Sequence, residues 1–186
     1  MQTTSTANSG KTIPVWDLGV RLFHWSLVTM VVGAYFTGDF RQLHRSLGYV
    51  VIGLLVFRLV WGLIGPHHAR FASFIPGPKR LITYIAAILT AKEKRYLGHN
   101  PAGAAMIVAL LMTLAAIGAT GYMMGMNRYF GQTWVETTHK TLVDALVILV
   151  GLHLGGVILA SYRHSENLVK AMITGRKPVD DPTRHL

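Results

Sequence analysis

The chain has 186 residues, of which 51% are hydrophobic and only 14% are charged, whereas a soluble domain carries about 25% charged residues. The absence of cysteine excludes disulfides, thiolate metal sites, iron–sulfur clusters and covalent haem attachment. The net charge of +10 does not indicate binding to nucleic acid. It is typical of a membrane protein, because lysine and arginine collect on the cytoplasmic loops of such proteins.

The chain begins with a polar segment, MQTTSTANSGKT, for which we expect a disordered tail over residues 1–12. A single membrane domain over 13–176 and a C-terminal tail over 177–186 complete the expected organisation. We expect no signal peptide, because the first apolar run is too long for an h-region and lacks a small-residue cleavage site.

Four segments are long and apolar enough to cross a bilayer core, which needs about 20 residues per helix. They cover residues 17–37, 43–64, 102–124 and 134–161. The sequence therefore predicts an all-α membrane protein whose fold is a bundle of four transmembrane helices.

A long basic stretch, 65–100, separates the second and third spans. Its middle, KRLITYIAAILT, predicts a cytoplasmic amphipathic helix on the membrane surface, because about 12 residues are too few for a fifth span. Most lysine and arginine residues lie in this stretch and near the two termini. The positive-inside rule therefore places both termini in the cytoplasm.

Four histidines fall within or at the edges of the predicted spans, where an ionisable side chain is costly and indicates function by default. They are His24, His44, His139 and His153. The other five lie in loops or tails and are interpreted as solvated surface residues. These are His67, His68, His99, His164 and His185.

The spacing of His139 and His153 places both on one face of the fourth span, at a rise of about 21 Å. Chain direction then sorts the four histidines into two depth-matched pairs, His24 with His153 and His44 with His139. Two imidazole pairs that bridge facing helices suit two non-covalent haems, with each iron bound by one pair. An interhelical hydrogen bond is the alternative role for any single histidine.

Cations near the predicted pairs are candidates to bind the haem propionates. Arg58 shares the face of His44 at the inner depth, and Arg21 precedes His24 by one turn. The full set of candidates is Arg21, Arg45, Arg58 and Lys140. The alternative is that these side chains extend toward the lipid headgroups.

Several other residues within the spans have two readings each. Gly48, Gly118 and Gly121 give a haem room to approach the backbone, or allow close helix packing. Asp144 takes part in proton uptake, or makes an interhelical hydrogen bond. Glu136 orients a ligand histidine, or stabilises the start of the fourth span.

Several sequence blocks follow one another in an order that resembles the prokaryotic cytochrome b561 family, over residues 14–178. They include VWDLGVRLFHW, LHRSLGYVVIGLLVFRLVWG, YLGHNPAGA, WVETTHK and HSENLVKAMITGRK. The resemblance implies a four-helix fold with two haem b groups in the bacterial cytoplasmic (inner) membrane. It implies iron ligands at the motif histidines, His24, His44, His139 and His153.

The resemblance also implies respiratory electron transport between the quinone pool and a redox partner in the periplasm. That partner would be a c-type cytochrome, a dehydrogenase or a hydrogenase. One alternative is a superoxide oxidase acting at the outer haem, where positive charge would attract an anion. Another is a histidine-lined metal transporter. Quinone is a candidate ligand, membrane lipid surrounds the spans, and a homodimer is left open.

Overall fold

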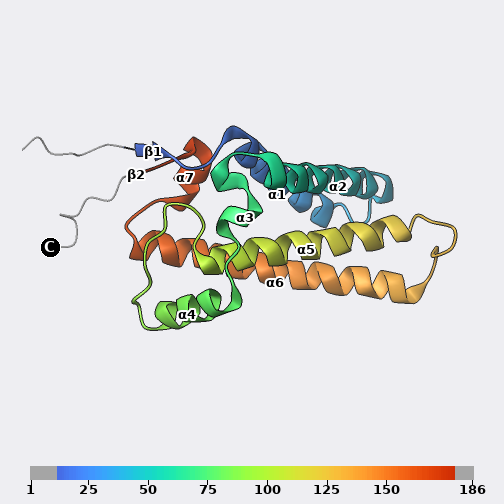
Figure 1. The fold of residues 1–186 in the computed structure, drawn as a ribbon. Coiled ribbons are helices and arrows are strands. Elements are labelled where there is room, and N and C mark those ends of the chain that lie inside the picture. The colour runs from blue at the N-terminus through green and yellow to red at the C-terminus, as the bar shows by residue number, and fades with distance from the viewer. Residues whose placement is uncertain (1–11, 179–186) are drawn as a thin grey trace, which may run out of the picture.

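The computed structural model describes residues 12–178, apart from the side chain of His68. Four long helices form the body of the molecule (Figure 1). They are α1 (Leu18–Phe36), α2 (Arg41–Ile64), α5 (Pro101–Met123) and α6 (Thr133–Arg163). Each is long and apolar enough to span a membrane, so the prediction of an all-α bundle with four spans is confirmed.

The four helices form two antiparallel hairpins, α1 with α2 and α5 with α6, which meet mainly where α2 packs on α5. Figure 1 shows both hairpin connections, residues 37–40 and 124–132, at one end of the bundle, which we call the hairpin end. The first and last described residues lie at the opposite end, the terminal end. The even number of spans produces this arrangement.

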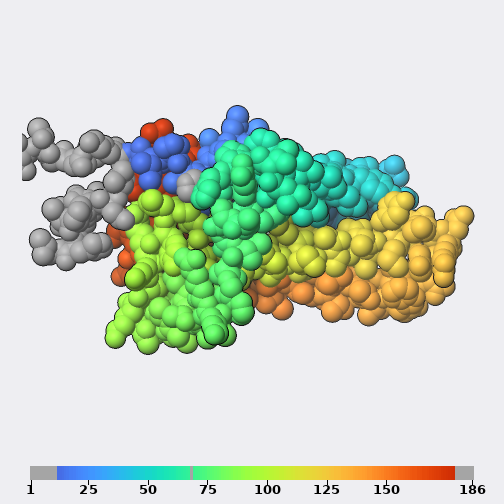
Figure 2. Space-filling model, viewed as in Figure 1, coloured from blue at the N-terminus to red at the C-terminus, as the bar shows by residue number. Residues whose placement is uncertain are grey.

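Short elements gather at the terminal end. Between α2 and α5 they are η1 (His67–Ala69), α3 (Phe71–Phe74) and α4 (Pro78–Leu89). Figure 2 shows α3 and α4 covering the terminal half of α5, whereas the hairpin half of the bundle carries no such cover. The predicted helix KRLITYIAAILT thus forms as α4, and its position on a membrane surface stays a prediction.

The chain after α6 folds back onto the terminal end. It forms α7 (Leu168–Thr174) and then β2 (Arg176–Pro178), which pairs antiparallel with β1 (Thr12–Pro14). Gly175 ends α7 with a φ of +78°, a left-handed conformation that favours glycine. Its carbonyl accepts hydrogen bonds from the backbone N–H groups of Val15 and Trp16. The two ends of the domain are therefore joined.

Two side-chain caps fix where the spans begin. Asp17 Oδ1 accepts hydrogen bonds from the Val20 N–H at 3.1 Å and from the Trp61 indole N–H at 3.0 Å. It therefore caps α1 and ties it to α2. Asn100 Oδ1 accepts from the Gly103 N–H at 2.7 Å, so that α5 starts at Pro101 with a first-turn donor satisfied.

An apolar core fills the middle of the bundle. Its buried members are Val51, Leu55, Leu114 and Leu146. Val51 follows His44 by two helical turns, and Leu146 lies midway between His139 and His153. The core therefore forms a layer between the two predicted histidine levels.

Candidate functional site

The structure brings His44 of α2 and His139 of α6 together near the hairpin end. Their ring centres are 6.3 Å apart and their planes are inclined by 72°. The bond from a transition metal to an imidazole nitrogen is about 2 Å. Two Nε2 atoms on opposite sides of one iron are thus about 4 Å apart, which puts the ring centres roughly 6 Å apart. The observed separation fits a haem iron between the rings.

The second nitrogen of each ring is already engaged. His44 Nδ1 lies 2.9 Å from the carbonyl oxygen of Ala34, so this nitrogen carries the proton and donates. His139 Nδ1 lies 3.0 Å from Thr120 Oγ1. Because the Thr120 hydroxyl is itself directed at the backbone carbonyls of α5, its oxygen accepts from the imidazole. Each Nε2 is thereby left as the basic nitrogen that a metal requires.

His24 of α1 and His153 of α6 lie together near the terminal end, where their imidazoles are close enough to interact electrostatically. His24 Nδ1 is buried and has no hydrogen-bond partner among the described residues. A buried nitrogen without a partner is costly, so this pair also fits a bound group that the polypeptide does not supply. The indole of Trp25 contacts the His24 ring edge-on, with 5.1 Å between ring centres.

The predicted propionate partners have protein contacts of their own. The Arg58 side chain is buried, donates to the Ala69 carbonyl at 2.9 Å and lies over the Phe71 ring. Arg21 donates to the carbonyl of Ile173 on α7. At the hairpin end, Arg45 donates to the Tyr49 hydroxyl and is exposed, as is Lys140. Their binding to propionates stays a prediction.

The three glycines differ in what surrounds them. A Cβ at Gly118 would lie 3.0 Å from Ile52, and one at Gly121 would lie 3.3 Å from His139. These two positions therefore allow close packing of α5. A Cβ at Gly48, one turn after His44, would meet nothing within 4 Å. Gly48 thus borders open space on the His44 side of α2.

The remaining candidates divide by exposure. Asp144 and Glu136 are exposed on α6 and make no hydrogen bond to a described residue. His99 is half-buried between Trp16 and Phe74, with ring centres 4.5 and 4.4 Å away. The prediction of a solvated His99 was therefore wrong, because its neighbour Asn100 caps α5 and holds the segment against the bundle.

Two further loop histidines are described: His67 is exposed and His164 is half-buried, whereas His185 lies outside the described residues. Within residues 12–178, no group of three or more histidine, cysteine or carboxylate side chains could hold a metal ion.

Comparison with known proteins finds a family and several relatives. The family model of prokaryotic cytochrome b561 matches residues 15–175. A probable Ni/Fe-hydrogenase B-type cytochrome subunit of Bradyrhizobium diazoefficiens is 24% identical over 216 positions, covering 91% of this chain and 87% of the relative. A subunit of the same description from Azotobacter vinelandii is 25% identical, covering 90% of this chain and 89% of the relative. Another, from Cupriavidus necator, is 26% identical and covers 93% of this chain and 91% of the relative.

The aligned region of 216 positions is longer than this chain of 186 residues. The relative therefore contains internal segments that this chain lacks. No solved structure matches the chain significantly.

Proposed function

The chain belongs to the prokaryotic cytochrome b561 family, and we propose that it transfers electrons across a membrane through two b-type haems. The observation that carries the proposal is the separation of 6.3 Å between the His44 and His139 rings, each with its Nδ1 already hydrogen-bonded. The second haem is proposed at His24 and His153, where a buried ring nitrogen has no described partner.

Haem iron, when bound, supplies one-electron chemistry. His44 and His139 would hold one iron, and the hydrogen bonds at their Nδ1 atoms orient the rings and raise the basicity of the nitrogens that would bind it. Leu55, Leu114 and Leu146 exclude water between the two levels. His139 and His153 are about 21 Å apart along α6, so the two sites connect opposite halves of the membrane.

We place the terminal end in the cytoplasm of a bacterium and the hairpin end in the periplasm. The support is the distribution of charge, since exposed lysine and arginine residues are concentrated at the terminal end. They include Lys79, Arg80, Lys92, Lys94 and Arg176. On this proposal the His44–His139 site is the outer haem site and the His24–His153 site is the inner one.

The proposed electron path joins the quinone pool to a redox partner in the periplasm. The named relatives are hydrogenase subunits, which favours a hydrogenase as that partner. A c-type cytochrome or another dehydrogenase is an alternative, because this chain lacks internal segments that the first relative has. Exposed cations at the hairpin end would guide an acidic partner surface. They are Arg41, Arg45, Arg128 and Lys140.

The same cations favour a second candidate function, oxidation of superoxide at the outer haem. A cluster of positive charge raises the local concentration of a small anion and its rate of encounter. Transfer of one electron from superoxide to the oxidised site would release dioxygen and leave that site reduced by one electron. The electron would then follow the same route to quinone.

The test is a haem count and a reduced-minus-oxidised optical spectrum on purified protein, followed by additions of quinol, ubiquinone-1 and superoxide. We expect two non-covalent haems per chain that exchange electrons with the quinone couple. Reduction by superoxide near the diffusion limit would select the second candidate, and its absence would remove that candidate. Protein without haem would overturn both functions.

A further inference from the structure

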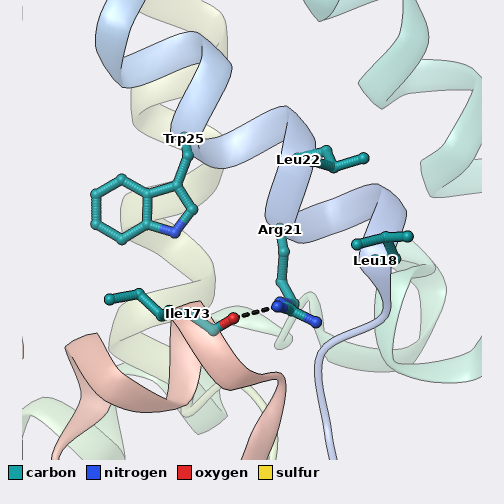
Figure 3. Close-up of a pocket in the computed structure, with 5 residues that line it drawn as sticks. All are labelled: Leu18, Arg21, Leu22, Trp25 and Ile173. Atoms are coloured by element: carbon teal, nitrogen blue, oxygen red, sulfur yellow. Dashed lines mark hydrogen bonds between the residues drawn. The ribbon is translucent and has the colours of Figure 1, made fainter.

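A groove lies between α1 and α7 (Figure 3), and one of its residues, Arg21, is also a predicted propionate partner. Its volume is about 290 Å³. The residues that line it are Leu18, Arg21, Leu22, Trp25 and Ile173. Four come from the first turns of α1, and the fifth comes from the last turn of α7.

The walls of the groove are apolar and face outward. Leu18 and Leu22 are 61% and 60% exposed, and Ile173 is 54% exposed. Because α1 is long and apolar enough to span a membrane, its exposed Leu18 and Leu22 side chains would meet acyl chains rather than water. A ligand would therefore enter sideways from the bilayer and would need an apolar body.

The polar groups in the groove are hydrogen-bond donors. One terminal nitrogen of Arg21 donates to the Ile173 carbonyl, while Arg21 Nε is buried and has no partner among the described residues. The indole N–H of Trp25 makes no hydrogen bond within residues 12–178. Figure 3 shows the indole nitrogen turned toward the space that Arg21 and Ile173 border. A ligand that carries a hydrogen-bond acceptor would therefore satisfy the free donors in the groove.

A flat apolar ring with carbonyl acceptors and an apolar tail satisfies each of these requirements. We propose that the groove between α1 and α7 binds the headgroup of a membrane quinone, with Arg21 and Trp25 as donors to a ring carbonyl. This inference rests on the proposed function, because quinone is the electron carrier in that path. Exposed Val32 and Phe36 continue the apolar face of α1 and give the isoprenoid tail a surface to follow.

The position of the groove suits exchange of electrons with the inner site. The Trp25 ring is in edge contact with the His24 ring, 5.1 Å between centres, and Arg21 precedes His24 by one turn. A headgroup in the groove would therefore be separated from the inner ligand by one side chain. This short path from the groove to His24 distinguishes the groove from other lipid-facing surfaces of the bundle.

Two variants of the haem-loaded protein test the groove, and a third is the control. Leu22→Trp fills the groove, and Trp25→Phe removes the N–H while keeping a ring against His24. Leu59→Trp is the control, because Leu59 lies at a similar distance from the terminal end on α2 and is 56% exposed, against 60% for Leu22. It therefore adds the same bulk on another face of the bundle.

The first measurement is photolabelling with an azido-ubiquinone, read by mass spectrometry of the peptides. We expect labelled peptides from α1 and α7 in wild type and in Leu59→Trp, and loss of that label in Leu22→Trp. The second is reoxidation of the reduced haems by ubiquinone-1. Leu22→Trp should slow it at least about tenfold, and Trp25→Phe should raise the KM about fivefold, the effect of one hydrogen bond.

Failure of quinone binding in the groove and failure of the proposed function give different results. In one outcome, ubiquinone-1 oxidises the wild-type haems, and Leu22→Trp changes neither the labelling nor the kinetics. This outcome would overturn quinone binding in the groove and would leave the proposed function unaffected. Wild-type haems that ubiquinone-1 does not oxidise would overturn the quinone path and the groove together. A phospholipid retained in native mass spectra of wild type and lost in Leu22→Trp, with unchanged quinone kinetics, would assign the groove to lipid instead.

Discussion

The rings of His44 and His139 lie with their centres 6.3 Å apart and their planes inclined by 72°, and each is anchored by a helix other than its own. His44 Nδ1 is bound by Ala34 of α1, and His139 Nδ1 by Thr120 of α5. All four spans therefore contribute to this site, two through the paired histidines and two through hydrogen bonds that set the ring orientation.

Thr120→Val should weaken the hairpin-end site without altering the other one. The change removes the acceptor of the His139 Nδ1 proton, and loss of such a partner costs about 10–100-fold in metal affinity. Transfer of haem to apomyoglobin measures the effect. Thr113→Val on the same helix is the control, and equal haem retention in the two variants would contradict the role of Thr120.

Replacing one histidine of a pair should remove one haem and spare the other. His139→Ala leaves the His24–His153 pair intact, and His24→Ala leaves the His44–His139 pair intact, so each variant should hold about one haem where wild type holds about two. The double variant should hold none. A pyridine haemochrome assay gives the count, and full haem content in either single variant would show that the pairs are not the ligands.

Gly48→Leu should block haem binding although the polypeptide leaves room for a side chain at this position. Gly48 follows His44 by four residues and shares its face of α2, whereas Gly53 follows it by nine and lies on the opposite face. Gly53 also borders open space, which makes Gly53→Leu the matched control. We expect the haem count to fall in Gly48→Leu alone, with unchanged helix content by circular dichroism. Equal haem counts would place the macrocycle elsewhere.

The spans and the histidine pairs follow from local features of the sequence. Length and hydropathy locate a membrane helix because the bilayer imposes both, and a spacing of fourteen residues puts His139 and His153 on one face whatever surrounds them. Alternating chain direction then fixes which histidines share a depth. These inferences need no knowledge of how one helix packs on another.

The anchors of the rings do not follow from the sequence. His44 donates to a backbone carbonyl, a group that every residue carries, so nothing marks Ala34 in advance. The propionate role predicted for Arg58 from its position on α2 stays a prediction, and nothing in the sequence indicates that its guanidinium donates to the Ala69 carbonyl of η1. The sequence does not show that the segment after α2 folds back to that depth.

The pairing of β1 with β2 is also a long-range result. Each strand has three residues, which is too short for a period of two to be recognised. Two ion pairs add to this contact between distant segments: Glu166 lies 3.2 Å from both Arg95 and Lys177. The Glu166 and Lys177 side chains are 4% exposed. Because these three residues lie far apart in the sequence, no local pattern predicts that they meet.

Glu166→Ala should loosen the terminal end more than loss of any exposed ion pair. The change removes the carboxylate from a buried ion pair with Lys177, and breaking a buried pair costs about 3–5 kcal/mol. Glu93→Ala is the comparison, because its bond to Arg163, at 2.7 Å, involves a more exposed cation and should contribute about 1 kcal/mol or less. The rate of limited proteolysis within residues 90–100 should rise at least tenfold more in Glu166→Ala than in Glu93→Ala.

The Glu93–Arg163 pair should also respond to acid. The hydrogen bond from Arg163 holds the pKa of the Glu93 carboxyl below its ordinary value of 4.5. Its contribution to stability is therefore complete above pH 4.5 and is lost as the pH falls through the lowered pKa of the folded state. Below the lowered pKa of Glu93, the Glu93→Ala variant should unfold at the same temperature as wild type. At pH 7 it should unfold at a lower temperature. A constant difference at every pH would show that Glu93 acts through packing and not through its charge.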